Sequence, residues 1–114
     1  MTLQEFYAAV DGNYDEAVSR LMGEALLRRF VLKFLNDPSF AALKQAIENG
    51  EREEAFRAAH TIKGLCLNLS FGKLLTSSET LTEALRSEMP ANVHELFTKV
   101  SEDYELTIDA IQKI

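Results

Sequence analysis

The 114-residue sequence contains little cysteine, proline or glycine, and no tryptophan. Its single cysteine, Cys66, excludes an internal disulfide, which is typical of proteins from a reducing compartment. Only two prolines and five glycines interrupt the chain, whereas the helix-favouring residues Leu, Ala, Glu and Lys are abundant. The composition therefore predicts an all-helical protein.

Basic residues are also scarce: 12 of them face 18 acidic residues, which gives a formal net charge of −6. Such a chain lacks the positive surface that nucleic acids and anionic membranes require. No apolar run approaches the roughly 18 residues that span a bilayer, and the first residues show no signal peptide. We therefore expect a soluble, cytoplasmic protein that binds neither nucleic acid nor membrane.

The helical periodicity predicts a single domain that covers residues 1–114. Short helices are expected first, and longer ones follow; their predicted ranges are 3–10, 15–21, 24–35, 39–49, 51–69, 73–88 and 91–114. Short connections make successive helices antiparallel. We expect an antiparallel four-helix bundle from about residue 39 to 114, with the short helices of residues 1–23 packed across one end.

The predicted helix over residues 51–69 carries an unusual pattern. On a helical wheel its core face collects five apolar residues, namely Ala55, Ala58, Ile62, Leu65 and Leu69. His60 lies almost opposite them, so it is predicted to face away from the bundle interior. Cys66 lies at the flank of the core face and is predicted to be a small buried hydrophobe.

Gly64 lies one turn after His60 on the same outer face. Glycine in mid-helix costs about 1 kcal/mol relative to alanine. That cost is reasonable if a side chain at this position would block access to His60. The other interpretation is a glycine that lets two helices pack closely.

Apolar and cationic side chains surround the histidine on this outer face. Phe56 and Leu67 form a small apolar patch, which is typical either of a docking surface or of partial burial under the N-terminal helices. Lys63 and Arg57 place positive charge there in a chain that is negative overall. An exposed neutral imidazole can attack phosphorus, and Lys63 can offset the charge of a phosphoryl group.

The run Ala59-His60-Thr61-Ile62-Lys63-Gly64 resembles the signature of histidine phosphotransfer (Hpt) domains. Asn68, Leu69 and the small Ser70 continue the motif, and Leu74 follows on the next helix. The resemblance covers residues 59–74 as a motif and about 24–113 as an architecture. It implies a four-helix bundle whose histidine is exposed midway along one helix.

The resemblance also implies roles for individual residues. His60 would accept the phosphoryl group, Lys63 would support it, and Gly64 would allow the partner to approach. The partners would be receiver domains of response regulators and a hybrid histidine kinase, and the receiver would supply both the acceptor aspartate and Mg²⁺. The chain itself would be a monomeric carrier that needs no cofactor and no metal, and would not be an enzyme.

Two positions depart from the family pattern. Ser70 stands where a glycine is usual. In many members a Gln or Glu of the following helix hydrogen-bonds the histidine ring, and by spacing Thr82 occupies that position here. We therefore expect Thr82 to be the candidate for a hydrogen bond to the ring.

Three other classes of function remain alternatives. A non-phosphorylated helical adaptor would bind receivers or other proteins through Phe56 and Leu67. A di-metal bundle requires Glu-x-x-His pairs, which neither His60 nor His94 provides. The phosphoryl-accepting module of a chemotaxis kinase would take phosphate from an attached ATP-binding domain, and this sequence shows none. A kinase is not expected, because no glycine-rich phosphate loop is present.

Overall fold

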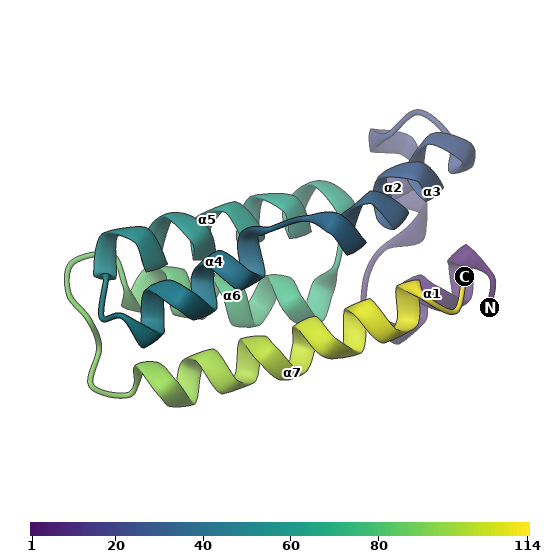
Figure 1. Cartoon of the computed structure of the whole chain (residues 1–114). Helices are drawn as coiled ribbons and strands as arrows, with labels where there is room; N and C mark the ends of the chain where they lie inside the picture. Colours follow the sequence, from purple (N-terminus) through teal and green to yellow (C-terminus); the bar gives the residue numbers. More distant parts are fainter.

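The computed structural model describes residues 1–114 and contains seven α-helices and one 3₁₀ turn. In chain order these are α1 (Leu3–Ala9), α2 (Tyr14–Arg20), α3 (Glu24–Lys33), η1 (Phe34–Asn36), α4 (Ser39–Glu48), α5 (Arg52–Leu69), α6 (Gly72–Ala84) and α7 (Val93–Ile111) (Figure 1). The all-helical fold predicted from the composition is confirmed. None of the helices is both long enough and apolar enough to cross a membrane.

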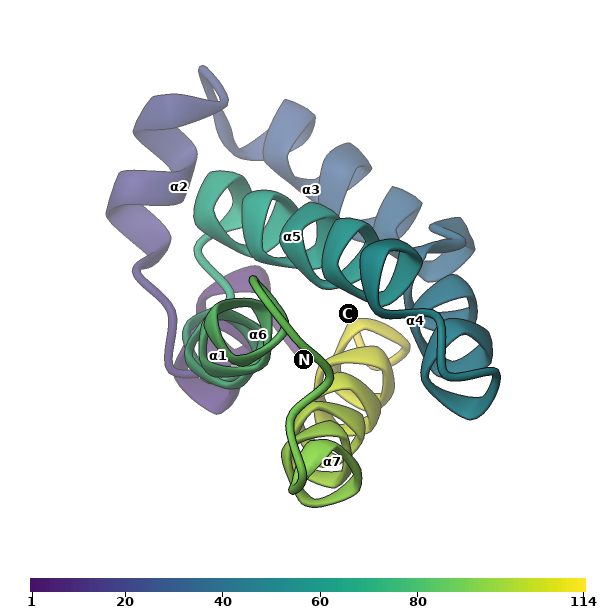
Figure 2. The same ribbon diagram turned by 90° about the vertical axis from the view of Figure 1, so that its left-hand side faces the viewer.

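Helices α4 to α7 form the four-helix bundle, and each runs antiparallel to the one before it (Figure 1). Seen along the bundle axis, these four helices are arranged around a common centre (Figure 2). Each helix contributes fully buried apolar side chains, such as Leu43, Ile62, Leu74 and Val100. Burial of one such side chain is worth about 1.5–3 kcal/mol, so the amphipathic faces of these helices hold the bundle together.

The N-terminal helices gather at one end of the bundle, as predicted, where α1 contacts α7 and both α2 and α3 contact α5. Helix α1 stands in line with α6, and the amide of Lys73 donates a hydrogen bond to the carbonyl of Val10 at 3.0 Å (Figure 2). Gly72 permits this approach, because a Cβ there would lie 1.8 Å from the Asp11 carbonyl oxygen. Helix α3 leads through η1 into α4.

The N-terminal segment also holds the end of α5. Ser70 ends this helix in the left-handed conformation, with φ 60°. The Tyr7 hydroxyl donates to the Leu69 carbonyl at 2.7 Å, and the Arg20 guanidinium donates to the Asn68 carbonyl at 3.0 Å. Carbonyls at a helix end have no partner within the helix, so α1 and α2 stabilise the last turn of the helix that carries the motif.

The predicted boundary between the last two helices was wrong. Helix α6 ends at Ala84 and not at Glu88, and α7 begins at Val93 and not at Ala91. The Arg52 guanidinium donates to the carbonyls of Leu85 and Arg86, at 2.7 and 2.9 Å. These bonds satisfy the end of α6 from the first turn of α5, so the chain turns away before Met89-Pro90.

Candidate functional site

His60 lies midway along α5 and is exposed to solvent. The helix begins at Arg52, after Gly50. Glu53 and Glu54 lie in its first turn, where their negative charge stabilises the positive end of the helix dipole. The outward orientation predicted by the helical wheel is confirmed. The imidazole is therefore accessible to a partner without any rearrangement of the bundle.

The buried face of α5 is centred slightly differently from the prediction. Ala59 and Cys66 are fully buried, whereas Leu65, assigned to the core, is only half-buried. The reason is that α5 packs against both α4 and α6, so its buried arc turns toward α6. Burial raises the pKa of the Cys66 thiol well above its ordinary value, which agrees with its interpretation as a small core hydrophobe.

Three side chains form a stack at the histidine. The Phe56 and His60 rings lie nearly parallel, with an interplanar angle of 11° and centroids 5.9 Å apart. The Arg86 guanidinium lies over the Phe56 ring, 5.3 Å from its centroid. Glu83 holds this guanidinium with two hydrogen bonds, of 2.8 and 3.2 Å. The imidazole thus rests against Phe56, which is covered by Arg86, and Arg86 is in turn held by Glu83 of α6.

Cationic and acidic groups alternate beside the ring. The Lys63 ammonium lies 3.7 Å from the Glu79 carboxylate. The pKa of Glu83 is lowered, mainly by its hydrogen bond from Arg86, and the positive charges of Arg86 and Lys63 act in the same direction. Because Glu79 is half-exposed and the pair is long, water screens this ion pair and Lys63 can exchange partners at little cost.

Gly64 is exposed, and a Cβ at this position would meet no atom within 4 Å. The helix-packing interpretation of this glycine is therefore wrong, since nothing inside the protein lies against it. What remains is an open stretch of helix surface one turn from His60.

The three predicted docking residues lie on the same helix as Gly64 and differ in exposure. The Leu67 side chain is 50% exposed and is not covered by the N-terminal helices. Arg57 is also exposed, and it donates a 2.6 Å hydrogen bond to Glu54 on its own helix. Phe56, by contrast, is half-buried, and the groups around it are His60 and Arg86.

The expectation for Thr82 was wrong. Its side chain is fully buried, and its hydroxyl donates a 2.6 Å hydrogen bond to the Ser78 carbonyl within α6. The spacing placed Thr82 level with His60, but on α6 this position points into the core. The next residue, Glu83, points outward and faces the histidine side of the bundle.

Sequence reasoning missed Glu79, Glu83 and Arg86. Their positions could have been found from the sequence, because α5 and α6 form an antiparallel hairpin around the turn at Ser70 and Phe71. Residues equally far from that turn lie opposite each other, as Lys63 and Glu79 do. The same rule pairs Phe56 with Arg86.

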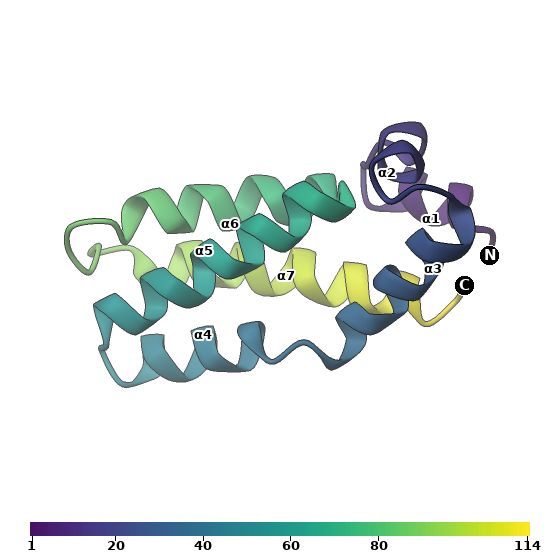
Figure 3. The same cartoon turned by 90° about the horizontal axis from the view of Figure 1, so that it is seen from above.

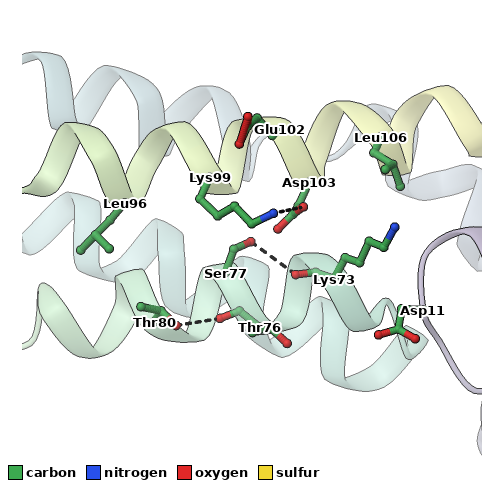
Figure 4. A pocket seen from close by; sticks show the side chains of 10 residues that line it. All are labelled: Asp11, Lys73, Thr76, Ser77, Thr80, Leu96, Lys99, Glu102, Asp103 and Leu106. Atoms are coloured by element: carbon green, nitrogen blue, oxygen red, sulfur yellow. Dashed lines mark hydrogen bonds and ion pairs between the residues drawn. The ribbon is translucent and has the colours of Figure 1, made fainter.

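The largest groove of the structure lies elsewhere, between α6 and α7 (Figure 4). It measures about 560 Å³, and none of the residues around His60 lines it. The buried Asp103 carboxylate points into it and accepts a 3.2 Å hydrogen bond from Lys99. The groove mixes lysines with carboxylates and hydroxyls, so it shows no preference for one class of ligand.

Comparison with known proteins gives one match. A family model described as the Hpt domain matches residues 36–113, which is more than half of the chain. The matched region covers α4 to α7, and it includes the whole surface around His60. No curated protein and no solved structure shows a significant match.

Proposed function

Because the chain belongs to the Hpt domain family, whose members are phosphocarrier modules of two-component signalling, we propose that it carries a phosphoryl group on His60. The group is accepted from a receiver-domain aspartate or a kinase and passed to the aspartate of a response regulator. The observation that carries this proposal is the exposed His60 with Lys63 and the open Gly64 beside it.

The transfer step requires little from the chain beyond position. A neutral imidazole nitrogen of His60 attacks phosphorus, the bond between phosphorus and the aspartyl oxygen breaks, and the carboxylate leaves with the electron pair. The phosphoryl group then lies on the ring, and transfer to the next aspartate reverses the step. Mg²⁺ would be held by the receiver, as the family resemblance implies, so the chain needs no cofactor of its own.

The surroundings of His60 support this role. Lys63 can leave Glu79 and make a charge-assisted contact with the phosphoryl oxygens. Phe56, held by Arg86 and Glu83, limits rotation of the imidazole. Gly64 leaves room for the aspartate of the receiver, while Leu67 and Arg57 offer apolar and charged contacts at the rim.

The remaining parts of the proposal rest on the family and on the exposure of α5. We propose that the partners are receiver domains and a hybrid histidine kinase, that the carrier acts as a monomer because α5 must stay accessible, and that it works in the cytoplasm. It is a carrier without independent turnover and therefore not an enzyme.

Radiolabel transfer tests the proposal directly. The protein and its His60→Gln variant are incubated with a phosphorylated receiver domain and Mg²⁺. We expect label on the wild type that is labile in acid, stable in alkali and absent from the variant. If no receiver from a broad panel transfers label, phosphotransfer fails for this chain, and the exposed face is a docking surface of a non-phosphorylated adaptor.

A further inference from the structure

Exposed apolar side chains concentrate on one part of the chain. Seven large hydrophobic residues are exposed in the structure, and four of them lie between residues 22 and 32: Met22, Leu26, Phe30 and Leu32. The opposite side of α3 is fully buried through Leu27 and Val31. Packing against the core therefore explains the apolar residues on the inner side of α3, whereas the exposed apolar residues on its outer sides require another explanation.

Four residues form what we call the α3 face: Leu26, Arg29, Phe30 and Lys33. They line one shallow hollow on the surface of α3. The Lys33 ammonium lies over the Phe30 ring at 5.8 Å from its centroid. On the helical wheel Leu32 lies on a different side of the same helix, although it is as exposed as Phe30, at 41%.

The α3 face is continuous with the surface of α5. Phe30 and Lys33 line a groove of about 410 Å³ together with Leu65 and Asn68 of α5. Figure 3 looks down on both helices, and nothing covers either of them from that side. Asn68 lies one turn after Gly64, so the groove begins where the open surface beside the histidine ends.

One partner of typical interface size would cover both the surface around His60 and the α3 face. A specific interface covers about 800 Å² on each protein, which corresponds to a disc of roughly 16 Å radius. Along α5, Asn68 lies about 12 Å from His60 at 1.5 Å per residue, and a packed neighbouring helix lies about 8–10 Å away. A domain centred on His60 and Gly64 therefore reaches the α3 face.

The charge of α3 favours a receiver domain as the partner. The chain has a net charge of −6, yet α3 carries Arg28, Arg29 and Lys33 against the single acidic Glu24. A receiver domain holds its acceptor aspartate and Mg²⁺ carboxylates in one acidic pocket, which would face His60, and positive charge on α3 at the edge of the interface would attract this acidic surface during docking. The α3 face also lies outside residues 36–113, the part shared with the family.

We infer that the α3 face is a second part of the receiver-docking surface and determines which receivers the chain binds. This inference rests on the proposed function, because it assumes that a receiver docks at His60. The family fold supplies the reacting histidine, and α3 adds apolar contact area and positive charge at the edge of the same interface.

The test compares variants on two sides of α3. Binding and phosphotransfer are measured with a receiver domain that labels the wild type, for Phe30→Ala, Phe30→Glu and the matched control Leu32→Glu. We expect Phe30→Ala to raise the Kd about fivefold and Phe30→Glu to raise it more than about tenfold. Transfer at saturating receiver and the Leu32→Glu Kd should stay at wild-type values. Circular dichroism melts verify that all variants are folded.

The outcomes separate the inference from the proposed function. Unchanged affinity of both Phe30 variants, with label still reaching His60, overturns the inference and leaves phosphotransfer standing. Equal weakening by Leu32→Glu also overturns it, since the effect would not be specific to the α3 face. A wild-type dimer in ultracentrifugation that Phe30→Glu dissociates assigns the face to a second copy instead. A wild type that never takes label refutes the proposed function itself.

Discussion

Replacement of Gly64 by alanine should make the protein more stable and less active. Alanine in a helix interior is favoured over glycine by about 0.5–1 kcal/mol. The added methyl group meets no atom within 4 Å, so no clash offsets this gain. For a chain of this size the gain corresponds to a rise in Tm of roughly 2–4 °C.

The same methyl group lies one turn from His60, where we propose that the receiver's aspartate approaches. A displacement of about 1 Å at a reacting centre can lower a rate by about 100-fold, so we expect at least a tenfold slower transfer to Gly64→Ala. Gly64→Gln should be slower still. Ala41→Gln, at an exposed position of α4, is the matched control and should transfer at the wild-type rate.

Thermal unfolding and single-turnover transfer from a labelled receiver measure the two effects on the same samples. A lower Tm for Gly64→Ala would show that the glycine does pack against something and would refute the structural argument. An unchanged transfer rate would show that the open surface at Gly64 is not the path of approach. Either result is decisive, because the two predicted effects have opposite signs.

Three further predictions concern the core and the side chains around His60. Burial raises the pKa of the Cys66 thiol above its ordinary value of 9.0, so the unfolded chain loses the thiol proton first and the unfolding free energy falls above pH 9, by about 1.4 kcal/mol in total between pH 8 and 10. Denaturant titrations over this range should show this additional loss in the wild type relative to Cys66→Ala, and equal losses would contradict the assignment. Tyr7→Phe leaves the carbonyl at the end of α5 without its 2.7 Å hydrogen bond, and should lower the unfolding free energy by about 1–3 kcal/mol; urea unfolding that shows no loss would refute the capping role. Arg86→Ala removes the cation over Phe56 and should slow transfer at saturating receiver about two- to fivefold, the equivalent of about 0.5–1 kcal/mol, with partial rescue by Arg86→Lys. Arg57→Ala removes the same charge from the same surface and should leave the transfer rate at saturating receiver unchanged. Equal effects of the two variants would mean that net charge alone matters.

Much of the architecture could be predicted from residue patterns alone. The period of apolar residues in α5 and α7, the capping box of Thr2 and Glu5, and the break at Ser70 are local features that act within a few residues. The outward position of His60 followed from the same periodicity, since a helix turns by about 100° per residue wherever it lies in the fold. The unusual position of Gly64 could be recognised locally too, because glycine destabilises the helix in which it lies.

The neighbours of the histidine depended on contacts between helices. Arg86 and Glu83 reach the site only because α6 folds back beside α5, and Thr82 is excluded from it by the rotation of α6 about its own axis. The end of α6 at Ala84 depends on Arg52, which is 32 residues earlier in the chain.

The sequence by itself determined which segments are helical and which side of α5 faces water, because short-range periodicity encodes both. Only the tertiary structure decided which side chains surround His60, and that the α3 face continues its surface. Those features depend on the rotation and packing of whole helices, which is set by the sum of many contacts between distant residues.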